Sequence, residues 1–183
     1  MSSQPKPMKC LTTAECRNWV KSRGMTLTPH PSRIPPVRQI RLPGPQILGR
    51  LASQFAGVLE KDSNLLVLVD DWALYKPEEM DSLVELRAES GEQRPLIEAP
   101  GHDLRRSDPG RLPRLLELLL GFQSQWSFYV HTMPSRMTLL FWEGDILDAW
   151  GPHGSRLHEI EEILEHARKD NPPPASDAKK RRG

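Results

Sequence analysis

Apolar side chains recur at helical spacing in five separate segments of the chain. The clearest is 46–59, where hydrophobic residues fall three or four positions apart and so share one face of a helix. The segment 109–122 is apolar over much of its circumference, which predicts a helix covered on two sides. Further helices are expected at 13–23, 77–90 and 155–169.

Continuous apolar runs bounded by turn residues predict the strands. Residues 65–69, Leu-Leu-Val-Leu-Val, are typical of a strand buried on both faces within a parallel sheet. Short strands are also expected at 37–42 and 95–99. Three later apolar segments are separated by turns, which predicts an antiparallel meander. They span 126–131, 137–142 and 146–150.

The order of these segments predicts the fold class. Helices and strands alternate before the meander, which is typical of parallel βαβ units. We therefore expect an α/β domain with a mixed sheet, in which a parallel βαβ portion joins the antiparallel C-terminal meander and helices cover the sheet. The single domain is expected at 10–169, between a flexible N-terminus at 1–9 and a disordered, Pro-rich basic tail at 170–183.

The first helix carries clear signals at both ends. Thr12 and Glu15 have the spacing of a capping box, and Gly24 suits a left-handed turn that ends the helix. Cys16 falls on the apolar side, where a thiol behaves as a small buried hydrophobe. The four prolines in residues 25–36 then exclude a helix and predict a connector that wraps around the domain.

Composition restricts the class of protein. The 183 residues are 37% hydrophobic and 27% charged, which fits one water-soluble domain. The longest apolar runs are far shorter than the roughly 20 residues that span a bilayer, and the first residues lack the pattern of a secretory signal. Two cysteines are too few for a disulfide framework. Together these features predict a cytoplasmic protein without a membrane segment.

Charge is segregated along the chain, although the net charge is only +1. Between Glu15 and Glu60 there are seven basic residues and no acid, whereas residues 60–103 contain twelve acids and four bases. Two patches of opposite sign are therefore plausible. They either pair with each other on the surface, or the acidic block forms a face for a basic partner.

Several common catalytic signatures do not occur in the sequence. It lacks the phosphate-binding loop, the dinucleotide fingerprint, the serine-hydrolase elbow and paired CxxC motifs. His158 begins a pattern like that of a zinc-protease helix, but Glu162 occupies the position that needs the second histidine. Both side chains are expected on the solvent face of the last helix.

The strongest catalytic candidates lie where strands are expected to end. Asp70 and Asp71 follow the central strand, and Glu98, His102 and Asp103 follow the next one. The carboxyl ends of neighbouring parallel strands open onto one crevice, where carboxylates could hold a divalent cation or orient a histidine base. The competing interpretation is that these are ordinary turn and capping residues, and no metal ligand set is assigned.

Candidate binding residues come from the aromatics and the acidic helix. Trp72, Trp142 and Trp150 lie at expected strand ends, where tryptophan either closes a core edge or anchors an interface. Glu78 and Glu85 lie on the acidic helix at 77–90. These five residues form the predicted protein-binding set.

The missing signatures and the charge blocks favour a cytosolic, non-enzymatic protein-binding module of the adaptor or inhibitor type, with no cofactor. The alternative is a metal-assisted or acid/base hydrolase that uses the strand-end carboxylates and His102, so catalysis stays open. The partner is expected to be a protein and not a membrane. Nucleic acid is not expected beyond a weak phosphate contact from residues 179–182. The sequence does not specify an oligomeric state.

Overall fold

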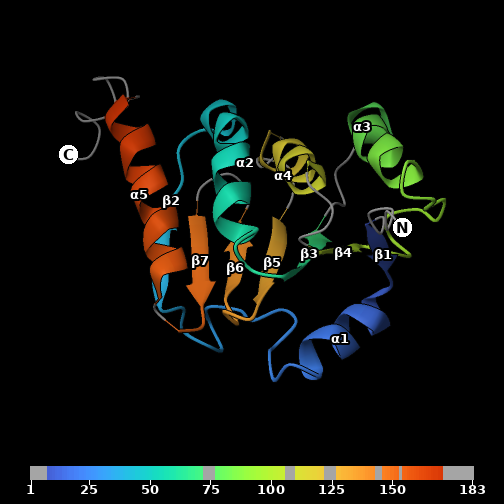
Figure 1. Ribbon diagram of the computed structural model, residues 1–183, viewed down its shortest axis with the longest axis horizontal. Coiled ribbons are helices and arrows are strands. Elements are labelled where there is room, and N and C mark those ends of the chain that lie inside the picture. The colour runs from blue at the N-terminus through green and yellow to red at the C-terminus, as the bar shows by residue number, and fades with distance from the viewer. Residues whose placement is uncertain are drawn as a thin grey trace, which may run out of the picture.

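The computed structural model describes residues 8–71, 77–105, 110–121, 127–142, 146–152 and 154–170. These residues form one α/β domain of helices around a single sheet (Figure 1). In chain order the elements are β1 (Lys9–Leu11), α1 (Thr13–Lys21), β2 (Arg38–Arg41), α2 (Pro45–Leu59), β3 (Asn64–Asp71), α3 (Pro77–Ala88), β4 (Gly101–Arg105), α4 (Arg111–Gly121), β5 (Ser127–Met133), β6 (Thr138–Phe141), β7 (Ile146–Trp150) and α5 (Ser155–Asp170). The tail beyond Asp170 and residues 1–7 lie outside the described residues.

The sheet has seven strands in the order β1-β4-β3-β5-β6-β7-β2. Every neighbouring pair is antiparallel. The meander predicted near the end of the chain is confirmed as β5, β6 and β7. The N-terminal part of the chain supplies both edges, because β1 pairs with β4 and β2 pairs with β7.

The predicted parallel βαβ portion is wrong. Strand β3 lies between β4 and β5 and is antiparallel to both, with Leu68 paired to Gly101 and Val67 to His102. The chain thus leaves β3 and enters β4 at the same end of the sheet, so α3 lies on a detour between them and not on a crossover. The strand expected at 95–99 is instead a turn, and β4 begins two residues later.

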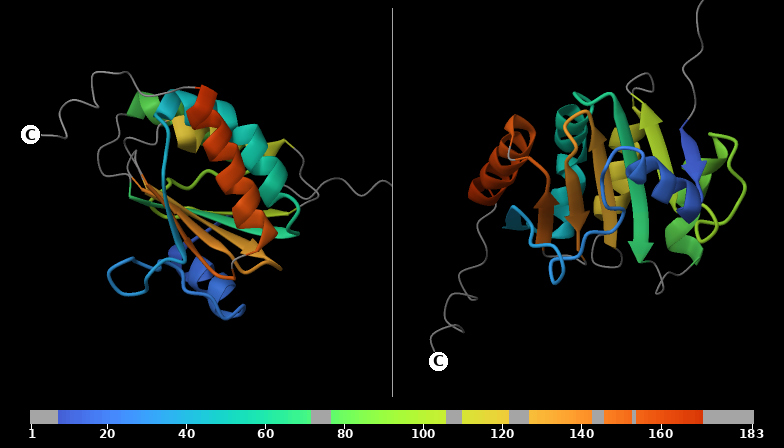
Figure 2. Two further views of the ribbon diagram at one scale, coloured as in Figure 1. Left: turned by 90° about the vertical axis from the view of Figure 1, so that its left-hand side faces the viewer. Right: turned by 90° about the horizontal axis from the view of Figure 1, so that it is seen from below.

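The apolar run in β3 misled the prediction because helices cover both faces of this antiparallel sheet. On one face, here called the upper face, lie α2, α3, α4 and α5, and on the lower face lie α1 and the connector at 22–37 (Figures 1 and 2). Val67 points into the upper core, while Leu66 and Leu68 point into the lower core. Burial on both faces therefore did not require parallel strands.

Helix α1 forms as the sequence predicts and packs closely on the lower face. The backbone N–H of Thr12 donates to Glu15 Oε2 at 2.8 Å, and the N–H of Glu15 donates to Thr12 Oγ1 at 3.2 Å, which completes the capping box. Gly24 follows the helix with φ +65°. A Cβ on Gly101 would lie 2.1 Å from Cys16 Sγ, so the glycine in β4 is what lets α1 approach the sheet.

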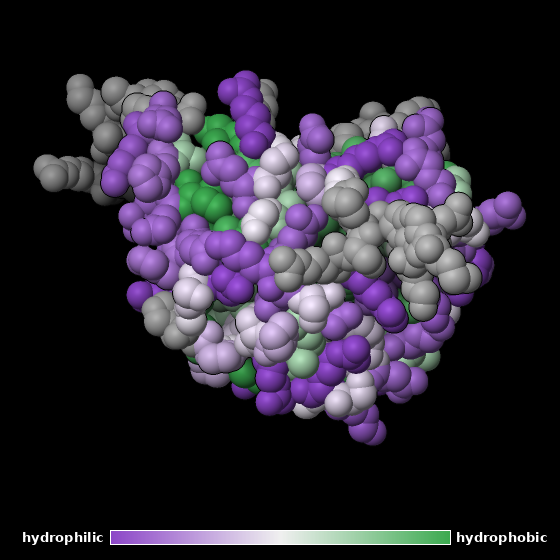
Figure 3. Space-filling model, viewed as in Figure 1, coloured by the Kyte–Doolittle hydropathy of each residue, from purple (hydrophilic) through white to green (hydrophobic). Residues whose placement is uncertain are grey.

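Two helices on the upper face are packed very differently. Five leucines of α4 are buried against α2 and the sheet. Of residues 81–88 in α3, only Leu83, Leu86 and Arg87 are buried, and Val84 is 54% exposed. The surface over α3 is mostly hydrophilic, with a few hydrophobic side chains visible between the polar ones (Figure 3). This loosely covered end of the sheet contains the candidate site.

Candidate functional site

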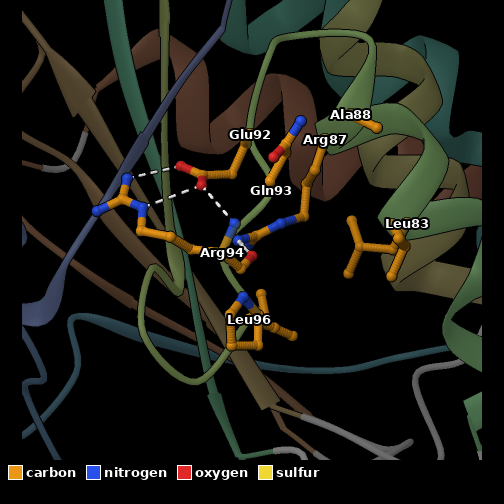
Figure 4. Close-up of a pocket in the computed structure, with 9 residues that line it drawn as sticks. Leu83, Arg87, Ala88, Glu92, Gln93, Arg94 and Leu96 are labelled. Atoms are coloured by element: carbon orange, nitrogen blue, oxygen red, sulfur yellow. Dashed lines mark hydrogen bonds and ion pairs between the residues drawn. The ribbon is translucent and has the colours of Figure 1, made fainter.

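A pocket of about 280 Å³ opens between α3 and the segment that follows it. The C-terminal half of α3 forms one wall, and residues 92–96 form the other (Figure 4). Gly91, with φ +80°, lets the chain turn back sharply between the two walls. The lining is Leu83, Val84, Arg87, Ala88, Glu92, Gln93, Arg94, Pro95 and Leu96.

Arg87 is an unusual lining residue because its side chain is buried, with only 2% of its surface exposed. Its Nη1 donates to the carbonyl of Ala99 at 2.7 Å, and its Nη2 donates to the carbonyl of Arg94 at 3.0 Å. Burial lowers the pKa of Arg87. Among the described residues no carboxylate forms an ion pair with it, so backbone carbonyls and one histidine satisfy this buried cation.

That histidine is His102, which is completely buried in β4 beneath α3. Its Nε2 lies 3.4 Å from Arg87 Nη1, and its Nδ1 lies 3.3 Å from the carbonyl oxygen of Val67. A guanidinium can only donate, so Nε2 accepts and the proton resides on Nδ1. Burial and the nearby charge of Arg87 lower the pKa of His102 to about 3. At neutral pH the ring is neutral, and both nitrogens have partners.

A tight ion pair lies within the outer wall of the pocket, and a hydrogen bond ties this wall to the sheet edge. Glu92 Oε2 accepts from Arg94 Nη2 at 2.6 Å, and Glu92 Oε1 accepts from Arg94 Nε at 2.9 Å. The hydrogen bonds from Arg94 lower the pKa of Glu92 to about 2. Arg94 Nη2 also donates to the carbonyl of Cys10 at 3.2 Å, which anchors this wall to β1.

The predicted catalytic residues are divided among different surroundings. Asp70 and Glu98 are exposed, and Asp71 ends β3 with a side chain outside the described atoms. His102 and Asp103 are adjacent in β4, so the pleat directs them to opposite faces of the sheet. Asp103 Oδ1 accepts from Trp19 Nε1 at 3.2 Å beneath α1, and burial raises the pKa of its carboxyl. His102 and Asp103 therefore do not share a site.

Within the described ranges, no cluster of three or more His, Cys, Asp or Glu side chains could hold a metal ion. The pleat of β4 explains part of this. Although β3 ends beside the start of β4, successive side chains alternate between the two faces. The catalytic role of these residues stays a prediction.

The predicted binding residues also separate. Trp72 lies outside the described residues, and Glu78 belongs to α3 without a described side chain. Trp142 is half-buried and donates from Nε1 to Asp148 Oδ2 at 2.8 Å. Trp150 is buried, and its Nε1 donates to the carbonyl of Ile34 at 2.8 Å. The two tryptophans pack in or against the lower core, while Glu85 remains exposed beside Val84.

Sequence reasoning missed the pocket itself. The available signal was Arg87, which follows Leu83 by four positions and therefore falls on the buried side of the helix. A charged residue at such a position indicates a helix that cannot pack as a simple apolar surface. Leu96 was assigned to a strand, so its place in a pocket wall was not predicted either.

The two charge blocks do not neutralise each other among the residues that the structure describes. Of the basic block, Arg38 pairs with Glu161 of α5 at 3.0 Å, and the other members form no ion pair with a described residue. In the acidic block, Glu89 pairs with Arg114 and Glu92 pairs with Arg94.

None of the described helices has the length and apolar character needed to cross a membrane. No protein-family model matches the chain, and neither a curated protein sequence nor a solved structure shows detectable similarity to it.

Proposed function

We propose that this protein is a non-enzymatic protein-binding module of the adaptor or inhibitor type. Its binding site is the α3 surface, which we define as Asp81, Val84, Glu85, Ile97 and Glu98 together with the adjoining pocket. The ligand is a basic segment of a partner protein that places one apolar side chain in the pocket. As in the sequence analysis, the compartment we propose is the cytosol.

The exposed apolar residues beside the pocket carry the proposal. Val84 lines the pocket and is 54% exposed, and Ile97 follows the lining residue Leu96 and is 66% exposed. Large apolar side chains that gather at a pocket mark a binding surface more often than isolated ones do. The volume of about 280 Å³ lies below the roughly 300–1,000 Å³ of most small-molecule sites. It is suited to a single anchoring side chain.

The charge around the pocket specifies the partner. Asp81, Glu85 and Glu98 are exposed, and none of them forms an ion pair with another described residue. Exposed carboxylates of this kind add little affinity individually, but together they steer a basic segment toward the surface and repel an acidic one. The expected partner therefore carries lysine or arginine on both sides of an apolar residue.

The buried network makes the pocket a preformed site. Arg87 connects α3 to the carbonyls of Ala99 and Arg94, and Arg94 connects the outer wall to β1. Walls held in this way lose little conformational freedom when a ligand binds. The hydrolase alternative lacks a comparable observation, because its described residues do not come together at one point.

The experiment that tests this function is a selection of random peptides displayed on phage. The immobilised protein should enrich sequences in which basic residues flank Leu, Met or Phe. The double variant Val84→Lys/Ile97→Lys should lose at least about tenfold in affinity for a selected peptide, because it removes the apolar contact and adds charge of the same sign as the peptide.

The matched control is Ser53→Lys/Gln54→Lys, which adds the same charge at two exposed positions of α2. Its affinity for the selected peptide should equal that of the wild type, and circular dichroism should show that all variants fold. Enrichment of acidic peptides, or binding that survives the double substitution, would show that the α3 surface is not the site.

A further inference from the structure

The large hydrophobic residues that are exposed in the described structure form two pairs. Val84 and Ile97 belong to the α3 surface, and Ile34 and Val37, which are 42% and 49% exposed, lie in the connector. The first pair is flanked by acids and the second by bases. Each apolar pair is thus surrounded by charged residues. They are acidic around Val84 and Ile97 and basic around Ile34 and Val37.

The second pair belongs to what we call the connector surface, formed by Arg33, Ile34, Val37 and Arg41. Two hydrogen bonds fix its backbone on the sheet. Trp150 Nε1 donates to the carbonyl of Ile34, and the N–H of Val37 donates to the carbonyl of Ala149, each at 2.8 Å. The connector surface is therefore ordered by its attachment to β7.

The charges of the connector surface are available to a partner. Arg33 and Arg41 are exposed and form no ion pair with any described residue. Between them, Arg38 is held by Glu161. The two arginines are opposite in charge to the three exposed carboxylates of the α3 surface, and the two apolar pairs are similar in size.

The two surfaces cannot meet within one molecule. The α3 surface lies at the β1 and β4 end of the sheet, while the connector surface lies at the β7 and β2 end. Six inter-strand spacings of about 4.8 Å separate the edge strands by about 29 Å. The helix and the connector also lie on opposite faces of the sheet (Figure 2). Contact between them requires a second copy.

We propose that the α3 surface of one molecule binds the connector surface of another copy of this chain. This inference rests on the proposed function, because it identifies the basic, apolar partner with the protein itself. The two contacting surfaces differ, so the contact is head-to-tail. Each added copy leaves one surface of each kind unoccupied, and the assembly grows until it closes into a ring.

The contact should be weak and sensitive to salt. Its charged residues are exposed, and interactions between exposed charges are largely screened when the Debye length falls to about 3 Å at 1 M salt. We expect the self-association constant, measured by sedimentation velocity over a concentration series, to fall at least about tenfold between 50 mM and 1 M NaCl.

Single charge reversals separate the two surfaces. Glu85→Lys inactivates the α3 surface, and Arg33→Glu inactivates the connector surface, so each variant alone should remain monomeric. In a 1:1 mixture, the intact α3 surface of Arg33→Glu can still bind the intact connector surface of Glu85→Lys. The two reversed side chains are also opposite in charge, so the mixture should regain an association that neither variant shows alone.

Matched reversals at distant exposed positions test for a general effect of charge. Glu165→Lys on α5 and Arg50→Glu on α2 make the same changes in net charge and should self-associate like the wild type. A wild type that stays monomeric at all concentrations would overturn the inference. Self-association that neither Glu85→Lys nor Arg33→Glu weakens, or a mixture that stays monomeric, would also overturn it.

The proposed function can be tested separately in the Arg33→Glu variant, which retains the α3 surface but cannot assemble through the connector. If this variant binds the selected basic peptides while the wild type is monomeric, the partner is another protein and only the self-association fails. If it does not bind them, the proposed function itself fails.

Discussion

Helices α3 and α4 lie on the same face of one sheet, but different forces hold them. Five buried leucines attach α4, whereas α3 buries Leu83 and Leu86 and places the charged Arg87 beside them. The guanidinium needs polar partners, and it finds them in two backbone carbonyls and His102. A helix with a continuous apolar stripe closes the core, while one interrupted by a buried charge leaves a pocket.

The same contrast explains which helix can bind a partner. The exposed side of α4 carries the Arg114–Glu89 ion pair, which already links it to α3. The exposed side of α3 carries Val84, Asp81 and Glu85 without partners among the described residues. A binding surface is thus available on the helix that contributes less to the core.

The largest expected effect is a difference in how much buried leucines of the two helices contribute to the stability of the domain. Leu116→Ala in α4 should lower the free energy of unfolding by about 3–5 kcal/mol, because the cavity lies between a helix and the sheet and cannot collapse. Leu83→Ala in α3 should cost only about 2–3 kcal/mol, since its cavity adjoins an open pocket that water can enter. Urea denaturation measures both, and equal costs would contradict the comparison.

A smaller effect is expected when the buried charge is removed. Arg87→Met should cost about 1–3 kcal/mol, because the carbonyls of Ala99 and Arg94 and the Nε2 of His102 lose their donor. The charge of Arg87 also lowers the pKa of His102, so that pKa should rise in the variant. NMR titration of the His102 ring measures the rise.

The control for this variant is Arg114→Met, which removes an exposed arginine that pairs with Glu89. It should change stability by less than about 0.5 kcal/mol, because exposed ion pairs contribute little. If both variants have the same cost, Arg87 does not hold α3 as the structure indicates.

A pH dependence of stability involves one buried histidine on each face of the sheet. Burial lowers the pKa of His102, below α3, to about 3 and that of His131, on the lower face, to about 4. The unfolded chain, with histidine pKa values near 6.5, binds protons at higher pH than the folded one. The stability contributed by these two rings is therefore present above about pH 6.5 and falls as the pH decreases toward 4.

The variant His131→Gln removes the pH-dependent stability that the histidine on the lower face contributes. Near pH 5 it should reduce the slope of unfolding free energy against pH by about 1.4 kcal/mol per pH unit, the value for one proton. The slope of unfolding free energy against pH that remains in this variant includes the contribution of His102. Chemical denaturation at several pH values measures both slopes, and an unchanged slope would show that His131 does not stay neutral in the folded protein.

Local signals in the sequence predicted the local structure well. The capping box of Thr12 and Glu15 and the β5–β6–β7 meander depend on neighbouring residues, and both are present. Strand direction depends on distant pairing, and the run at 65–69 is compatible with either direction. The parallel arrangement was therefore the part of the fold that periodicity alone could not settle.

The candidate site was less predictable because it depends on that same pairing. Because residues 101–105 form strand β4, consecutive residues such as His102 and Asp103 point into opposite cores. Trp150 likewise closes the lower core beneath the connector. Of the predicted residues with described side chains, Glu85 and Glu98 are exposed on the α3 surface. Glu85 could be predicted because a helix position that points to solvent needs no tertiary information.

The placement of both sheet edges has a consequence for synthesis on the ribosome. Residues 9–11 and 38–41 emerge early, but β1 pairs with residues 101–103 and β2 with residues 146–149. Neither edge strand can find its neighbour until most of the chain has been translated. Folding rates fall as contacting residues become more distant in sequence. During synthesis, the strand positions of the N-terminal segment therefore stay unpaired until their partners have emerged. Until β7 emerges, β2 in particular is a segment that a chaperone could protect.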